Sequence, residues 1–150
     1  MLVDVVSEVV IDRPVDVVSA YAGDPGNAPA WYAHIASVEW ETPPPLALGS
    51  RLAFVAHFLG RRLAYTYEVV ELSDRRLVMR TAQGPFPMET TYAWEPEGDG
   101  RTRMALRNRG EPSGFSRVAG PMMTRAMSRA NAKDLGRLKA LLESGTTAPR

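Results

Sequence analysis

The first stretch of the chain is apolar and β-branched. Residues Val3 to Ile11 are rich in valine and carry only isolated polar side chains, a pattern that favours a buried strand over a helix of this length. Pro14 follows closely, and proline cannot continue a sheet because it has no N–H to donate. We therefore predict a strand over 3–11.

Two short helices are predicted after this strand. Pro14 suits the first turn of a helix, Asp12 is a candidate for its N-cap, and Gly23 closes it after about two turns. Residues 24–27, Asp-Pro-Gly-Asn, are typical of a turn. A second short helix is predicted over 28–33. The chain therefore leaves its first strand through a helical corner.

Apolar and polar positions alternate through the middle of the chain, from Ile35 to Arg109, between turns that contain Gly, Pro or Asp. A period of two is that of a strand with one buried face, and short turns connect antiparallel neighbours. Helical spacing is absent from this region. We predict six further strands, over 35–41, 50–59, 62–72, 76–82, 87–95 and 101–109.

The period changes after 111–114 and becomes helical to about Glu143. The buried stripe of this helix is spaced by four and three and consists of Met123, Met127, Asn131, Leu135, Leu138 and Leu142. Pro121 must start the helix or kink it, because an interior proline costs about 3 kcal/mol. We predict one long amphipathic C-terminal helix.

Composition narrows the class of protein. A length of 150 residues favours one domain, which we place over 1–143, with 144–150 as a flexible tail. The 18 basic and 17 acidic residues give a net charge of +1, so no strong field favours nucleic acid or an anionic membrane as a partner. The sequence contains no cysteine, no basic leader and no apolar run of about 18 residues. We expect a soluble, cytoplasmic protein without a membrane span, either monomer or homodimer.

Short motifs along this order of elements resemble a known family. They are 10–18 (VIDRPVDVV), Asp24-Pro25 followed by Trp31, 48–51 (LGSR), Gly60-Arg61, Leu77, Gly84-Pro85, Tyr92, 95–98 (EPEG) followed by Thr102, and 135–143. Together they resemble the START-like, helix-grip superfamily, also called SRPBCC, and within it the polyketide cyclase/dehydrase-like branch. The resemblance implies an α+β fold in which a curved, seven-stranded antiparallel sheet wraps around the long C-terminal helix and encloses a ligand cavity.

Hairpin register decides which side chains can face that cavity. A two-residue turn at Gly60–Arg61 would pair Phe58 with Leu63. Pairing Trp94 with Thr102 would align the last two strands. Both registers place the large apolar side chains on one face of the sheet.

The outer face of the sheet is predicted to carry paired charges. The register of the last two strands sets Glu95 opposite Arg101 and Glu89 opposite Arg107. The row of arginines on the last strand is then a solvated, paired surface. The same parity points His57 outward, unless an odd-length turn reverses it.

The inner face is rich in aromatic and thioether side chains together with a few polar groups. The residues we predict to contact a ligand are Phe54, Phe58, Tyr65, Tyr67, Met79, Met88, Thr90, Tyr92, Trp94, Asn108, Met123, Met127 and Asn131. A filled core is the competing interpretation, because methionine and aromatic stripes are common in packing. Buried phenols and amides need partners, and a few polar groups in an apolar hollow are typical of a small-molecule site.

The candidates for acid–base chemistry are few. His57, Tyr65, Tyr92 and Asn131 are the candidate catalytic residues, and His34 is expected at the surface near the cavity mouth. Two histidines without recognisably spaced carboxylates do not make a metal site, so we predict no metal. No glycine-rich phosphate loop and no nucleophile elbow occurs, so we predict no cofactor and no hydrolase chemistry.

Three classes of function fit this inventory. The first is a binding protein for a hydrophobic or aromatic small molecule, lipid-like or polyketide-like. The second is a cofactor-independent cyclase or dehydrase that holds its substrate in the same cavity and works largely by positioning it. The third is a ligand-sensing regulatory or stress-response protein. The fold does not decide among them, because this superfamily uses one cavity for many purposes.

Overall fold

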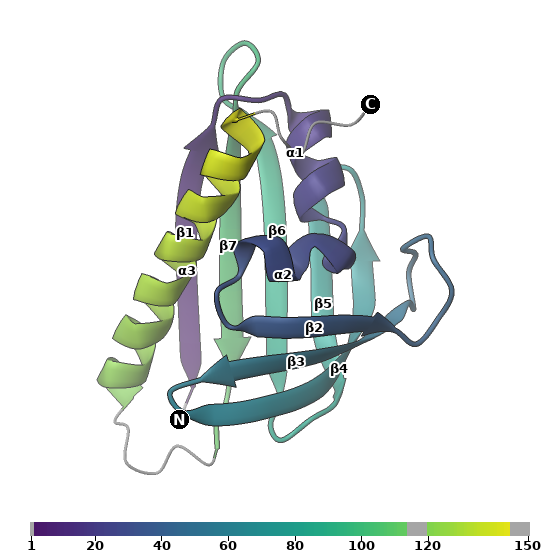
Figure 1. Ribbon diagram of the computed structural model, residues 1–150, viewed down its shortest axis with the longest axis vertical. Coiled ribbons are helices and arrows are strands. Elements are labelled where there is room, and N and C mark those ends of the chain that lie inside the picture. Colours follow the sequence, from purple (N-terminus) through teal and green to yellow (C-terminus); the bar gives the residue numbers. More distant parts are fainter. Residues whose placement is uncertain (1, 114–119, 145–150) are drawn as a thin grey trace.

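The computed structural model describes residues 2–113 and 120–144 of the chain (Figure 1). The elements in chain order are β1 (Val3–Ile11), α1 (Val15–Ala22), the 3-10 turn η1 (Pro25–Asn27), α2 (Ala28–Trp31), β2 (Ile35–Trp40), β3 (Arg51–Phe58), β4 (Arg61–Leu72), β5 (Arg76–Gln83), β6 (Met88–Pro96), β7 (Thr102–Gly110) and α3 (Gly120–Glu143). The predicted order of strands and helices is confirmed. α3 begins beside Pro121, as the sequence required.

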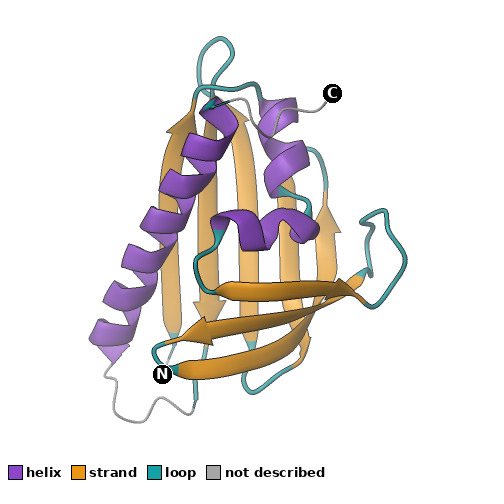
Figure 2. Ribbon diagram, in the orientation of Figure 1, coloured by secondary structure: helices purple, strands orange, loops and turns teal. Residues whose placement is uncertain are grey.

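The strands form one antiparallel sheet in the order β1-β7-β6-β5-β4-β3-β2. Figure 2 shows α1, α2 and α3 on the same side of this sheet, and β2, β3 and β4 turning across in front of the remaining strands. The curvature leaves a concave face on which α3 lies. The predicted α+β helix-grip fold is therefore confirmed.

The corner between β1 and α1 differs from the prediction in its cap. Pro14 occupies the N-cap of α1 and no side chain caps the helix, so the assignment of Asp12 as cap is wrong. The Asp12 N–H instead donates to Glu143 Oε2 at 2.8 Å, and Arg13 Nη1 donates to the Leu142 carbonyl at 2.6 Å. The corner is thereby tied to the last turn of α3, which supplies acceptors that local sequence cannot reveal.

The second short helix is shorter than predicted. α2 ends at Trp31, and Tyr32 is already extended, with φ −84° and ψ 126°. Residues 32–34 are used to reach β2 rather than to continue the helix. Upstream, the Asp24 side chain accepts from the Gly26 N–H at 2.9 Å, which caps the 3-10 turn η1.

The two predicted registers are each wrong by two residues. Phe58 pairs with Arg61 rather than Leu63, and Trp94 pairs with Met104 rather than Thr102. The β3–β4 turn consists of Leu59 and Gly60, not Gly60 and Arg61. A shift of two residues leaves every side chain on its predicted face, because side-chain direction in a strand has a period of two.

The loop between β6 and β7 explains the second shift. Pro96 pairs with Thr102, and the intervening residues close through a 2.9 Å bond from the Glu97 N–H to the Arg101 carbonyl. Gly98 and Gly100 both have positive φ, 71° and 70°, which glycine adopts without steric cost. A longer glycine-containing loop therefore replaces the tighter turn that the sequence pattern suggested.

Charges on the outer face are paired, but with other partners than predicted. Glu89 accepts from Arg80 at 2.8 Å and lies 3.7 Å from Arg109, while Arg107 pairs with Asp4 of β1 at 2.6 Å. The pairs Glu89–Arg107 and Glu95–Arg101 are wrong, because the register shift moves each arginine by one position on its face. The prediction of a paired surface on β7 is confirmed for the arginines at 103, 107 and 109.

The β3–β4 turn offers a test of backbone strain. Leu59 has φ 51° and Gly60 has φ 78°, the signs required by a type I′ turn, and leucine is poorly suited to that conformation. The Leu59 side chain is exposed, so its removal leaves the core intact. We expect Leu59→Asn to raise the free energy of unfolding by about 1 kcal/mol, measured by chemical denaturation. A neutral or destabilising effect would contradict this turn assignment.

Candidate functional site

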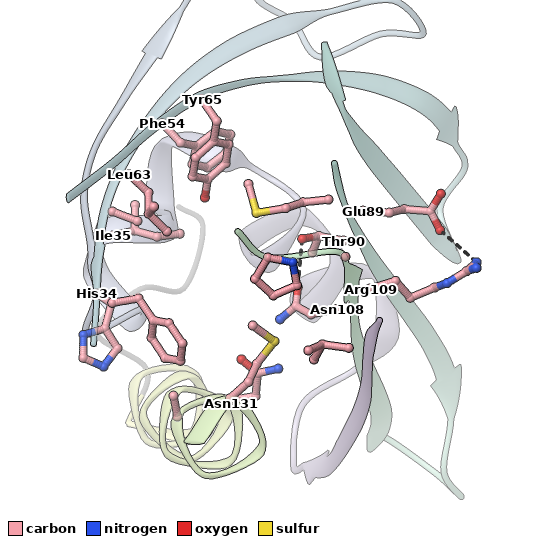
Figure 3. Close-up of a pocket in the computed structure, with 18 of the residues that line it drawn as sticks. His34, Ile35, Phe54, Leu63, Tyr65, Glu89, Thr90, Asn108, Arg109 and Asn131 are labelled. Carbon is pink, nitrogen blue, oxygen red and sulfur yellow. Dashed lines mark hydrogen bonds and ion pairs between the residues drawn. The ribbon is translucent and has the colours of Figure 1, made fainter. Parts of the chain in front are cut away.

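A cavity lies between the concave face of the sheet and the first half of α3 (Figure 3). Its volume is about 140 Å³, which corresponds to roughly five water molecules at about 30 Å³ each. All seven strands, α3 and the connection between α2 and β2 contribute residues to the wall. Most of the lining is apolar.

Most of the residues predicted to contact a ligand meet in this wall. Those that line the cavity are Phe54, Phe58, Tyr65, Tyr67, Met79, Met88, Thr90, Tyr92, Asn108, Met123, Met127 and Asn131. The register error did not affect them because it preserved parity. Their contact with a ligand stays a prediction.

Trp94 is the exception among the predicted ligand contacts. It has the parity of the cavity residues but lies beyond Tyr92 on β6, where α1 covers the sheet. Its ring packs so closely on Gly23 that a Cβ there would lie 3.3 Å from it. Trp94 lines a separate hollow beneath α1 and fills the core at that end. The alternation of side chains predicts which face of a strand a residue lies on, but not how far along the strand the cavity extends.

The two histidines are placed differently. His57 is exposed on the outer side of β3, opposite Arg62, and is not part of the cavity wall. Its assignment as a catalytic candidate is therefore wrong for chemistry inside the cavity, as the even hairpin register implied. His34 is exposed at the edge of the cavity, and its ring lies edge-on to Phe58 with 6.0 Å between centroids.

Aromatic rings form one side of the cavity. Phe54 and Tyr65 stack with 5.4 Å between centroids and 3° between planes, and Tyr67 lies edge-on to both. Figure 3 shows the Phe54 and Tyr65 rings side by side above the open centre. Gly84 permits this arrangement, because a Cβ at this position would lie 2.9 Å from Tyr65 Cβ. The Gly-Pro motif after β5 thus lets the chain close directly over an aromatic wall.

Two sets of hydroxyls are satisfied within the protein. The Tyr67 hydroxyl is 2.8 Å from Thr90 Oγ1, which in turn donates to Asn108 Oδ1 at 2.9 Å. The Tyr32 and Tyr92 hydroxyls are 2.7 Å apart. Each of these hydroxyls already has a hydrogen-bond partner within the protein. They therefore hold the wall of the cavity together without a bound ligand.

One polar group in the wall lacks such a partner. Asn131 is 4% exposed, and its Nδ2 is buried without a hydrogen bond to any described residue. An unpaired buried N–H costs about 1–3 kcal/mol, so a bound molecule that accepts from Asn131 would recover that cost.

Asp134 is a cavity residue that sequence reasoning missed. It is 2% exposed, and its Oδ1 accepts from the Ala33 N–H at 3.1 Å and from Arg137 Nη1 at 3.3 Å. The same guanidinium nitrogen donates to the Trp31 carbonyl at 2.8 Å. Burial raises the pKa of Asp134, although its bond from Ala33 and the charge of Arg137 oppose this effect. The position three residues after Asn131, on the same helix face, was the available signal.

Buried tyrosines allow a test of this wall. Burial raises the pKa of Tyr32, Tyr65 and Tyr92 well above 10 and that of Tyr67 to about 12. In the unfolded chain these phenols lose their protons near pH 10, so their stabilising contribution is complete below that pH and falls as the pH rises above it. We expect tyrosinate absorbance to appear mainly together with alkaline unfolding.

The half-buried Tyr21 provides the control for that titration. Its pKa is raised by partial burial, and it is the tyrosine outside the cavity wall. As the pH is raised, Tyr21 should ionise before the protein unfolds and give a small first rise in tyrosinate absorbance. Tyr21→Phe should remove this first rise and leave unchanged the larger rise that accompanies unfolding. Ionisation of all phenols near pH 10, before any loss of secondary structure, would show that the wall is open to water.

No described residues group three or more His, Asp or Glu side chains where they could hold a metal ion. Within the same part of the chain, no helix is both long and apolar enough to cross a bilayer.

The comparisons with known proteins agree with this architecture. A family model described as polyketide cyclase/dehydrase and lipid transport matches residues 3–143. No curated protein sequence matches the chain. Among solved structures, TTHA0849 from Thermus thermophilus is similar with a TM-score of 0.81 and 21% identity, covering 96% of this chain and 99% of that one.

Two further solved structures show the same fold. A START superfamily protein from Mycobacterium smegmatis has a TM-score of 0.82 at 17% identity, covering 95% of this chain and 99% of that one. The Zhui aromatase/cyclase from a Streptomyces species has a TM-score of 0.76 at 16% identity, covering 95% and 94%. A curved sheet wrapped around one long helix defines the class of fold: this chain has the helix-grip fold of these structures.

The match of the family model over 3–143 gives the assignment within that class. The chain belongs to the polyketide cyclase/dehydrase and lipid transport family.

Proposed function

We propose that this protein binds a small aromatic molecule carrying a carbonyl or similar acceptor oxygen, in the cavity between the sheet and α3. The observation that carries the proposal is the Asn131 amide, whose buried Nδ2 has no partner among the described residues and whose side chain lines a mostly apolar cavity. Apolar walls supply affinity, and a few placed polar groups select the ligand.

The size of the cavity limits how much of the ligand is enclosed. A cavity of about 150 Å³ lined by apolar side chains takes up benzene in another protein, and this cavity measures about 140 Å³. One ring therefore fits among Phe54, Tyr65 and Met79. The remainder of a larger, polyketide-like molecule would extend toward the opening near His34, which is exposed at the edge of the cavity.

A matched pair of ligands tests the role of Asn131. Acetophenone and ethylbenzene have nearly the same shape, but only acetophenone has a carbonyl oxygen. We expect the protein to bind acetophenone about tenfold more tightly, since a hydrogen bond to a buried donor contributes about 1.4 kcal/mol. Chemical-shift titration of the protein amides measures both affinities.

Two variants identify the source of that preference. Asn131→Leu should abolish it while the protein remains folded, because leucine fills a similar volume and removes the unpaired N–H. Met127→Leu changes an apolar wall residue and should leave the preference intact. Equal affinity for both ligands in the unaltered protein, or an unchanged preference in Asn131→Leu, would refute the proposal.

Asp134 favours a second candidate, a cyclase or dehydrase acting on a carbonyl-containing substrate in the same cavity. Asp134 lines the cavity, and burial raises the pKa of its carboxyl group, which would favour its part in a proton transfer to or from a substrate held there. The test uses a poly-β-ketone thioester and follows formation of an aromatic product. Asp134→Asn should then lower turnover about 100-fold without changing acetophenone affinity. Absence of any product with the unaltered protein would remove this candidate.

A further inference from the structure

The solvent-facing side of α3 carries a row of cations. Arg125, Arg129 and Lys133 follow one another at intervals of four residues, all are exposed, and none has a carboxylate partner within 2–113 and 120–144. At 100° per residue, these three and Met122 lie within a quarter turn of the helix surface. In Figure 1, α3 forms one edge of the molecule.

This row differs from the other charged surfaces of the protein. Most arginines on the outer face of the sheet are neutralised by nearby carboxylates, as in Arg51–Glu68 at 3.1 Å and Arg76–Glu71 at 2.9 Å. The first turn of α3, by contrast, contains no acidic residue, so the positive end of the helix dipole adds to the cations. Positive potential therefore concentrates on this face, although the net charge of the chain is only +1.

Exposed apolar side chains lie beside the cations. Met122 is 62% exposed and Leu2 is 65% exposed. A shallow groove runs between Leu2 and α3, with Arg125 and Arg129 in its wall and no carboxylate among the residues that line it. Cations next to exposed apolar groups are typical of surfaces that rest on a membrane, where the apolar groups enter the boundary between headgroups and acyl chains.

We propose that this face of α3 docks on an anionic phospholipid bilayer. Lipid phosphates and carboxylates would accept hydrogen bonds from Arg125 and Arg129, while Met122 and Leu2 would enter the interface. An acidic protein would satisfy the cations equally well but would leave the two apolar side chains unexplained. The neighbouring Met123 lines the cavity, so docking would bring the ligand site close to the bilayer. The proposal goes beyond ligand binding and does not depend on it.

Vesicle sedimentation tests the proposal. The full chain is mixed with phosphatidylcholine vesicles with and without about 30% phosphatidylserine, at low and at physiological ionic strength. We expect binding to the anionic vesicles alone, weakened by salt. The variant R125Q/R129Q should bind about 30-fold more weakly, since each cation near such a surface contributes roughly fivefold to the binding constant.

A charge-matched control isolates the position of the cations. Arg75 and Arg101 are exposed arginines without ion pairs in the described residues, and they lie in hairpin loops. R75Q/R101Q removes two positive charges, as R125Q/R129Q does. The net charge therefore changes from +1 to −1 in either variant. It should bind anionic vesicles like the unaltered protein. Equal loss in both variants would overturn the proposal, because the effect would then be one of total charge.

Met122→Ser distinguishes a bilayer from an acidic macromolecule. We expect it to weaken vesicle binding about fivefold through the loss of apolar burial, and to leave binding of soluble poly-L-glutamate unchanged. Absence of vesicle binding, or vesicle binding that Met122→Ser does not alter, would overturn the membrane assignment. Poly-L-glutamate binding together with no vesicle binding would point instead to an acidic protein partner.

Discussion

Replacing Leu138 by alanine should lower the free energy of unfolding by about 3 kcal/mol, which for a chain of this size corresponds to a fall in Tm of about 9 °C. Leu138 is fully buried and belongs to the main core cluster with Leu135 and Leu142. These leucines pack α3 against the core beneath the sheet. Leu138→Ala therefore leaves an empty space between α3 and the sheet. Denaturant unfolding with an unchanged slope measures the effect.

The control for this variant lies on the opposite face of the same helix. Met122 is a large apolar side chain that is mostly exposed, so Met122→Ala should change stability by less than about 0.5 kcal/mol. Similar losses in Met122→Ala and Leu138→Ala would mean that the burial pattern of α3 is incorrect. A difference of about 3 kcal/mol would confirm which face the sheet grips.

The second large effect is expected at Asp134. Asp134→Ala should destabilise the protein by about 2–3 kcal/mol, because it leaves the Ala33 N–H without its acceptor and Arg137 without its carboxylate. The same change should release the connection between α2 and β2 from α3. Hydrogen exchange of the Ala33 amide, measured by NMR, should therefore accelerate more than exchange in the β6 and β7 strands.

Asp134→Asn separates the two contributions. Its amide oxygen can still accept from Ala33, and it also removes a carboxylate whose pKa is raised by burial. The loss should then be less than half of that in Asp134→Ala, and Ala33 should keep most of its protection. If both variants were equally destabilised with Ala33 still protected, the bond from Ala33 to Asp134 would not hold this segment in place.

Side-chain parity was the most transferable prediction from the sequence. Alternation placed Phe54, Tyr67 and Met88 on the concave face even though the hairpin partners were shifted by two residues. The outward direction of His57 followed from the same rule. A register error of two residues does not change the face on which a side chain lies. It does change the residue opposite each side chain on the neighbouring strand, as it did for Glu89.

Positions that depend on three elements at once were not predictable. Asp134 has an acidic side chain on the buried face of a helix, and only the packing of the α2–β2 connection against α3 explains it. Trp94 has cavity parity, yet α1 covers it. Periodicity in the sequence describes one helix or strand at a time. It cannot predict which helix packs over which part of the sheet.

The sequence by itself determined the order of strands and helices, the face on which each side chain lies, and the family, because these follow from local periodicity and short motifs. The tertiary structure alone decided the position of each residue along its strand relative to the cavity and the partners of the outer charges. It also decided that the Asn131 Nδ2 has no partner among the described residues, while the Tyr67 and Tyr92 hydroxyls are hydrogen-bonded. The physical reason is that a hydrogen bond or a cavity depends on distances of a few ångströms between segments far apart in the chain, and sheet curvature sets those distances.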